Sequence, residues 1–183
     1  MSVSRRNPCV RACWPVLFAA GLLLVTGRAM ALVMPQDVQI AARALGFLAK
    51  PPSGDVRVAV VYAADNPQSL EEGRHLMQIL GGGLTVGNIT LKPVLVPVTA
   101  LAGTRAGLIF LTAGIGPEAT LVAAASRSAQ VPCVTTDLNQ VRSGNCAIGI
   151  RSAPQIEIMV NRAAASASGT AFSTIFRVMI REL

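Results

Sequence analysis

The chain has 183 residues, of which 52% are hydrophobic and 4% aromatic, and its formal net charge at pH 7 is +7. Four of its sixteen Lys and Arg residues lie before residue 32, so the rest of the chain carries twelve basic and nine acidic side chains, a net charge of +3. These basic residues are scattered, whereas a nucleic-acid interface needs a basic stripe, usually with aromatic side chains for stacking. Composition therefore argues against a nucleic-acid partner.

The N-terminus has the three parts of a secretory signal peptide. A start with three arginines precedes an apolar run of twelve residues, 14–25, and Ala29-Met30-Ala31 is a small-x-small cleavage site. An uncleaved membrane anchor is disfavoured because a spanning helix needs about 20 apolar residues. Arg5-Arg6 suggests the twin-arginine export route, but Asn-Pro-Cys follows in place of the usual apolar pair.

We therefore predict that residues 1–31 are a cleaved signal peptide and that residues 32–183 form one domain in the periplasm. About 150 residues are enough for a single domain with its own core. The two cysteines before residue 32 leave with the signal peptide, and neither sits at a cleavage site of lipoprotein type.

Two cysteines, Cys133 and Cys146, remain in the mature chain. An even number of cysteines in an exported protein predicts a disulfide. A metal site would need further ligands, and the only histidine, His75, is distant in sequence. A catalytic thiol would need a C-x-x-C motif or a partner that stabilises the thiolate. We predict that the pair forms a disulfide that closes a loop between two strands.

The first half of the predicted domain alternates helix and strand. Apolar residues at helical spacing predict a helix over 38–48, with Asp37 as its N-cap. The run VRVAVVY, residues 56–62, is apolar on both faces after its arginine, as in a buried strand of a parallel sheet. The next helix has Asn66 as its N-cap and Pro67 at its first position, and three glycines end it.

The second half continues this alternation. A strand over 89–98 contains Pro93, which places it near an edge of the sheet because proline cannot donate to a neighbouring strand. A buried strand is predicted at 106–112, followed by a helix that starts at Pro117 and a short strand at 131–136.

The C-terminal part predicts two strands joined by a turn, at 145–152 and 154–161. A closing helix over 170–181 follows, and its apolar residues pack either on the sheet or on a second subunit, so a homodimer is an open alternative. The whole pattern predicts an α/β fold with a mainly parallel sheet sandwiched by helices and a C-terminal antiparallel hairpin.

Few residues suggest catalysis. The chain has no G-x-S-x-G motif, no pair of carboxylates suited to acid and base catalysis, and acidic residues that mostly lie at the ends of predicted elements. A single histidine, His75, cannot form a histidine-based metal cluster. We predict that the protein is not an enzyme and uses no cofactor or metal.

One glycine-rich turn partly matches a nucleotide-binding motif. Gly114-x-Gly116-x-x-Ala119 lies between a strand and a helix, and Asp137 follows about twenty residues later, as in a dinucleotide-binding fingerprint. Against this reading, Pro117 removes an amide donor and Glu118 puts negative charge where pyrophosphate would lie. We interpret Gly114 and Gly116 as a tight turn at the carboxyl end of a strand, where a small polar or anionic ligand could still bind.

The C-terminal third resembles the YfiR family of small periplasmic proteins. In that family a strand with a Ser/Thr-x-x-Asp-like end precedes a glycine-rich strand, and here residues 135–137 and 144–148 occupy these places. An FEIN strand, an alanine-rich segment and a glycine follow in the family, and Asn161, residues 163–165 and Gly169 stand in that order here. Departures from the family pattern include Met159 where glutamate is usual and Asn145-Cys146 where Gly-Met is usual.

The resemblance implies a non-enzymatic inhibitor. It implies that the partner is the periplasmic sensor domain of an inner-membrane diguanylate cyclase, and that oxidation of the Cys133–Cys146 pair affects stability and repression. Two alternatives stay open. The α/β pattern also suits a periplasmic small-ligand-binding protein resembling one lobe of a solute-binding protein, and the Gly114 turn leaves a nucleotide-using oxidoreductase as a remote alternative.

Overall fold

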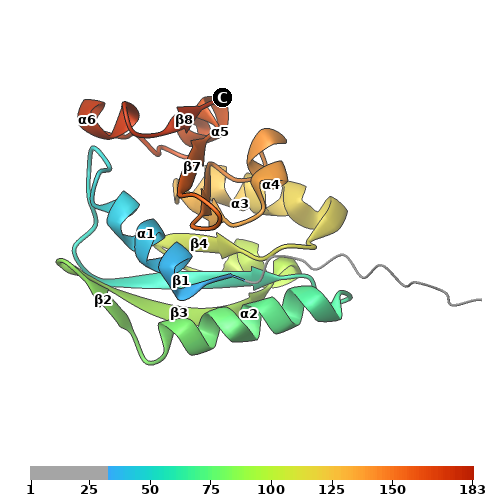
Figure 1. Ribbon diagram of the computed structural model, residues 1–183. Coiled ribbons are helices and arrows are strands. Elements are labelled where there is room, and N and C mark those ends of the chain that lie inside the picture. The colour runs from blue at the N-terminus through green and yellow to red at the C-terminus, as the bar shows by residue number, and fades with distance from the viewer. Residues whose placement is uncertain (1–32) are drawn as a thin grey trace, which may run out of the picture. The chain divides into compact units, whose positions relative to one another are not determined.

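The computed structural model describes residues 33–183, so the signal peptide predicted over 1–31 lies outside the described residues. The described chain forms one eight-stranded sheet, in the order β2-β3-β1-β4-β5-β6-β7-β8. Figure 1 labels β1 to β4 at one end of this order and β7 and β8 at the other. The strands are β1 (Gly54–Tyr62), β2 (Leu84–Val86), β3 (Ile89–Pro97), β4 (Leu108–Leu111), β5 (Cys133–Thr135), β6 (Ile148–Arg151), β7 (Glu157–Val160) and β8 (Arg181–Glu182). Strands β3, β1, β4, β5 and β6 are parallel, while β2 pairs antiparallel with β3 and β7 pairs antiparallel with β6. The predicted α/β class, with a C-terminal antiparallel hairpin, is confirmed.

Helices cover both faces of this sheet. They are α1 (Pro35–Leu45), α2 (Pro67–Leu80), α3 (Ala119–Ala129), α4 (Leu138–Arg142), α5 (Arg162–Ala167) and α6 (Thr174–Arg177), with 3₁₀ turns η1 (Val98–Gly103) and η2 (Gly116–Glu118). Alternate residues of β1 belong to the two halves of the core, on opposite faces of the sheet. Val58 and Val60 pack with α1 and α2, whereas Ala59 and Val61 pack with η1 and α3. This arrangement explains why β1 is apolar on both faces. Within residues 33–183, no helix is both long and apolar enough to cross a membrane.

Helix α2 begins as the sequence predicts. The Asn66 side chain accepts hydrogen bonds from the backbone N–H of Gln68 at 3.0 Å and of Ser69 at 3.4 Å, and Pro67 is the first helical residue. The helix ends at Gly81, whose φ of +53° lies in the left-handed region that favours glycine. The predicted cap and both predicted ends of this helix are confirmed.

Helix α1 begins earlier than predicted. Pro35 is its first residue and Met34 its N-cap, so the prediction of Asp37 as the N-cap is wrong. Asp37 lies in the first turn, where its buried carboxylate accepts hydrogen bonds from the backbone N–H of Met34 at 2.8 Å and of Ser152 at 2.7 Å. The side chain therefore caps the helix from inside and also ties α1 to the β6–β7 turn.

Strand β2 was not predicted, yet it explains Pro93. The three residues of β2 pair with β3 only as far as the Leu84–Leu91 pair. Pro93 pairs with Val58 of β1 on one side. On the other side of β3, the pairing with β2 stops at Leu91, so no β2 residue lies opposite Pro93. Because that side of Pro93 needs no backbone donor, the proline is tolerated, and the predicted position near an edge is confirmed.

The closing helix predicted over 170–181 is wrong. Only α6, four residues long, is helical there, and β8 follows it beside β7. The preceding residues pair with the α1–β1 connection: Ala49 N–H donates to Ala171 O at 2.7 Å, and Ser173 N–H donates to Phe47 O at 2.8 Å. The Phe47 and Phe176 rings stack with centroids 4.8 Å apart. These long-range contacts hold the segment extended and leave little chain for a helix.

Candidate functional site

The Gly114–Gly116 turn follows β4 at the carboxyl edge of the parallel strands. Both glycines have φ in the left-handed region, +73° and +64°. The Asn66 side-chain amide donates to Gly114 O at 2.8 Å, and a Cβ added at Gly114 would lie 2.6 Å from the same amide nitrogen. Glycine is therefore needed at 114 both for the backbone conformation and for the close approach of Asn66. The predicted tight turn is present, and its ability to bind a ligand stays a prediction.

Hydroxyl groups connect the loops that follow β1 and β4. Ser69 Oγ accepts from Ala63 N–H at 3.0 Å and lies 2.7 Å from Thr112 Oγ1, which donates to Val61 O at 2.9 Å. Ser69 and Thr112 are both buried. Their hydrogen bonds fix the first turn of α2 against the end of β4, so the loops at this edge of the sheet are held in a fixed arrangement.

Glu72 is the buried carboxylate of this edge. Its Oε2 accepts from Ala113 N–H at 2.8 Å, and its Oε1 accepts from the Thr136 hydroxyl at 3.4 Å. Burial raises the pKa of Glu72, and the negative charge of Asp137 raises it further, while the two hydrogen bonds act in the opposite direction. Among the described residues, no basic side chain forms an ion pair with Glu72.

Burial of the Glu72 carboxylate predicts that the stability of the fold depends on pH. Because its pKa is raised, Glu72 binds a proton more tightly in the folded than in the unfolded chain, so its contribution to stability falls as the pH rises from its ordinary value of 4.5 through the folded value. We expect Glu72→Gln to gain stability relative to the wild type between about pH 4.5 and pH 7.5. Urea unfolding of both proteins at the two pH values measures this difference.

Glu71→Gln is the control for that comparison, because Glu71 is the exposed neighbour of Glu72 on the same helix. The difference between Glu71→Gln and the wild type should vary much less over the same pH interval. A Glu72→Gln difference that is identical at both pH values would show that burial of this carboxylate carries no protonation penalty.

The connections of the strands make this edge a topological switch point. The chain leaves β1 through α2 and continues to β3 on one side, whereas it leaves β4 through α3 and continues to β5 on the other side. The loops after β1 and β4 therefore diverge, and open α/β sheets commonly bind ligands where such loops diverge. Asn66 and Gly114 face each other across this point.

The predicted disulfide is present. Cys133 is the first residue of β5 and Cys146 lies just before β6, with their Cα atoms 5.1 Å apart. Both cysteines are buried in the core on the α3 side of the sheet. Between them lies α4, which was not predicted and is capped by Asp137, whose side chain accepts from Asn139 N–H at 3.0 Å. The bridge therefore closes a loop that contains a helix.

Other residues considered from the sequence have local roles. Asp137, at the dinucleotide-fingerprint spacing, serves as the N-cap of α4. His75 Nε2 lies 3.1 Å from Val33 O, in contact with the start of the described chain. Within residues 33–183, no cluster of three or more His, Cys, Asp and Glu side chains is arranged to hold a metal ion.

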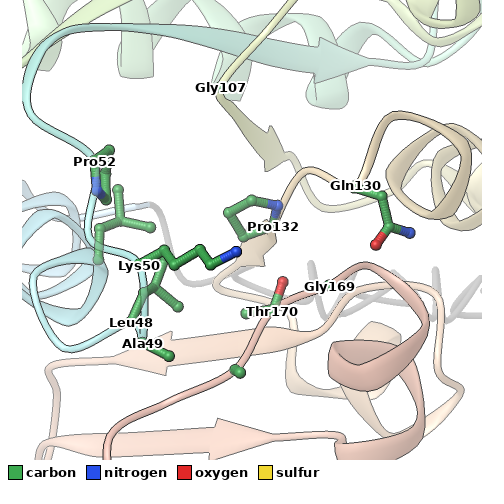
Figure 2. A pocket seen from close by; sticks show the side chains of 11 residues that line it. Leu48, Ala49, Lys50, Pro52, Gly107, Gln130, Pro132, Gly169 and Thr170 are labelled. Atoms are coloured by element: carbon green, nitrogen blue, oxygen red, sulfur yellow. The ribbon is translucent and has the colours of Figure 1, made fainter.

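A hollow that was not predicted lies at the opposite, amino edge of the sheet. Its volume is about 480 Å³, and Gly107 and Pro132, the residues before β4 and β5, form its base. Figure 2 shows the Lys50 side chain extending into this hollow between Pro132 and Thr170. No local sequence signal marks this site, because its lining comes from four segments that are distant in sequence.

The C-terminal residues form an exposed apolar surface, which we call the C-terminal apolar surface. Its members are large apolar side chains between 45% and 83% exposed: Ile175, Val178, Met179 and Leu183. They flank Phe176 in sequence, and Phe176 itself is buried against Phe47 and Phe172. The sequence predicted that apolar residues here would pack on the sheet or on a second subunit, and in this chain only Phe176 is fully buried.

Comparisons with known proteins show similarity of fold alone. No protein-family model and no curated protein matches this sequence. A crystal structure of a conserved domain protein from Vibrio cholerae O1 biovar El Tor strain N16961 is similar, with a TM-score of 0.57 and 11% identity over 81% of this chain and 59% of that one. The ABC domain from Streptococcus pneumoniae in complex with L-Trp is similar, with a TM-score of 0.53 and 12% identity over 80% of this chain and 60% of that one. The chain thus spans about three fifths of the length of either structure.

Proposed function

We propose that this protein is an exported, non-enzymatic regulator that acts by binding another protein. The resemblance of residues 135–169 to the YfiR family supports a specific partner, the periplasmic sensor domain of an inner-membrane diguanylate cyclase. Binding would repress that enzyme and lower cyclic di-GMP in the cell. The disulfide supports the exported location, because disulfides persist in oxidising compartments such as the periplasm.

The observation that carries this proposal is the C-terminal apolar surface. Val178 is 83% exposed and Ile175 is 74% exposed, and both project from a short segment at the end of the chain. Burying a side chain of this size against a partner stabilises a complex by about 1.5–3 kcal/mol. Large apolar side chains that stay exposed on a folded domain often mark a protein–protein contact site.

Polar replacement of this surface tests the proposal. We expect Ile175→Ser with Val178→Ser to abolish co-purification with the membrane diguanylate cyclase and to raise cellular cyclic di-GMP to the level of a deletion strain. Both side chains are exposed, so the fold should lose no more than about 0.5 kcal/mol per site. Co-purification after crosslinking and nucleotide extraction measure the two effects.

Leu121→Ser is the matched control, because Leu121 is a 48% exposed apolar residue on α3, outside the C-terminal apolar surface. It should leave both the capture of the cyclase and the cyclic di-GMP level unchanged. Full repression by the Ile175→Ser, Val178→Ser variant would contradict the proposal. Loss of a homodimer with retained repression would assign this surface to self-association instead.

A second candidate function is binding of a small periplasmic ligand at the carboxyl edge. The similarity of fold to a domain that has been solved with L-Trp, and the fixed loops at the switch point, favour this candidate. A thermal-shift screen with amino acids, run on the wild type and on Glu72→Gln, would separate it from the first. A ligand at about 100 times its dissociation constant adds about 2.7 kcal/mol of stability.

A further inference from the structure

The hollow at the amino edge is held open by long-range hydrogen bonds. One wall is the α1–β1 connection, fixed to the C-terminal segment by the bond from Ala49 N–H to Ala171 O at 2.7 Å and by the bridge between Leu48 and Phe172. The other side is closed by Gln130, whose side-chain amide donates to Ala167 O at 2.9 Å and to Arg127 O at 2.7 Å. The hollow is therefore preformed and does not depend on a mobile loop.

The lining of this hollow mixes apolar and polar groups and carries one charge. Leu48, Pro52 and Pro132 supply apolar surface, and Gln130 and Thr170 supply polar groups. Lys50 is the only ionisable side chain among the lining residues. Figure 2 shows its ammonium group lying over the hollow and not turned away from it. The volume of about 480 Å³ falls within the range of about 300–1,000 Å³ that small-molecule sites occupy.

A second, shallower hollow adjoins the first. Its volume is about 420 Å³, and it shares Pro52 and Gly107 with the first. Arg57 and Arg105 line it, and Asp55 is the only acidic residue there. Arg57 lies on β1 and Arg105 lies in the segment that leads into β4. The two segments are adjacent, since the N–H of Gly107, just before β4, donates to Arg57 O at 2.8 Å.

The charges of the two hollows are unbalanced. Three cationic side chains, Lys50, Arg57 and Arg105, face one carboxylate. The ion pairs found within residues 33–183 join other side chains, namely Glu182 with Arg162 and Arg177, and Glu157 with Arg181. A concave site with an excess of one charge concentrates ligands of the opposite charge.

We propose that the two hollows form one binding site for a small amphipathic anion, an organic acid with an apolar body. The anionic group lies among Lys50, Arg57 and Arg105, where it accepts charge-assisted hydrogen bonds. The apolar body fills the first hollow against Leu45 and Leu48. This site lies at the edge opposite to Gly114, so it is separate from the second candidate function and does not depend on the first.

Titration of the purified protein with defined probes tests this site. The probes are 4-phenylbutyrate and octanoate, with 4-phenylbutanamide as the neutral match and acetate as an anion without an apolar body. We expect saturable amide shifts in ¹H–¹⁵N NMR spectra at residues 48–50, Gly107 and 169–171 with the two amphipathic anions. The amide and acetate should bind at least about tenfold more weakly, because one lacks the charge and the other the apolar group.

Substitutions then locate the anionic group. Lys50→Ala and Arg105→Ala should each weaken 4-phenylbutyrate binding at least about fivefold, and binding should also weaken with added salt. Lys92→Ala and Arg127→Ala are the controls, since both are exposed basic residues outside the lining of the two hollows, and they should leave binding unchanged. NMR spectra of each variant without probe show whether its fold is intact.

Three outcomes would overturn the proposal. The first is the absence of saturable shifts with both amphipathic anions. The second is equal binding of 4-phenylbutanamide, which would mean that the cationic side chains play no part. The third is a set of shifts centred on Gly114 and Glu72, which would place the ligand at the carboxyl edge. None of these results bears on the cyclase, because the assay contains only the purified protein.

Discussion

Replacing Cys133 and Cys146 together by alanine is expected to lower the free energy of unfolding by about 3 kcal/mol. The bridge spans 13 positions of sequence, and removing it gives the unfolded chain the freedom that the closed loop denies it. Both sulfur atoms are buried, so the alanines also leave a small space in the core on the α3 side of the sheet. For a domain of about 150 residues this loss corresponds to a fall in Tm of about 6–12 °C.

Thermal unfolding of the wild type with and without reductant provides the comparison. The reduced wild type should approach the double variant, and the reductant should not change the variant any further. A fall of less than about 2 °C in the double variant would mean that the loop is held by packing alone, without help from the covalent bond. Co-purification of the reduced protein with the cyclase would then show whether the bond matters for binding.

The disulfide stabilises the segment that contains the short helix α4. A helix of five residues is far too short to be stable alone, since isolated helices need about 12–15 residues. Asp137 caps its start, and Leu138 and Val141 are buried against Met159 on β7. The bridge limits the freedom of the segment that carries this helix, and so it makes a short element part of the stable fold.

The main elements could be predicted because their signals are local. Strand β1 has a continuous apolar run, and α2 has a capping asparagine, a proline at its first position and glycine at its end. The disulfide could be predicted from the number of cysteines and from the expectation that the chain is exported. Each of these inferences uses residues that lie within one element or a simple count, and the structure confirms the elements and the bridge.

The errors occur where distant residues decide the structure. Three-residue β2 and five-residue α4 are too short to show a period. Residues 170–181 have helical apolar spacing, but pairing with residues 47–49 determines their backbone. The sequence contains no local sign of that pairing.

In the candidate site, too, the features with local sequence signals could be predicted and those that depend on distant residues could not. The turn at Gly114 could be predicted from its glycines and its place after a buried strand. The N-cap Asn66 and the helical residues Ser69 and Glu72 recur every three positions and so share one face of α2, a pattern that could have indicated a buried polar cluster. Their partners in the loops after β4 and β5 depend on the order of the strands and could not be predicted from spacing.

Gly149→Ala is the second change with a large expected effect, because α4 packs directly on this glycine. A Cβ at position 149 would lie 2.6 Å from Leu138 Cδ2 and 2.7 Å from Val141 Cγ2. The added methyl group must displace α4 from β6, so we expect a loss of about 1–3 kcal/mol. Gly103→Ala is the control, since a Cβ at 103 meets nothing within 4 Å and should change stability by less than about 0.5 kcal/mol.

A double substitution shows whether the loss comes from this overlap. Leu138→Ala alone should destabilise, since Leu138 is buried, but it also removes the nearer of the two overlapping groups. The loss in Gly149→Ala, Leu138→Ala should therefore be smaller than the sum of the two single losses by about 1 kcal/mol. Urea unfolding of the four proteins gives the coupling. Strict additivity would mean that the overlap with Leu138 is not the cause of the loss in Gly149→Ala.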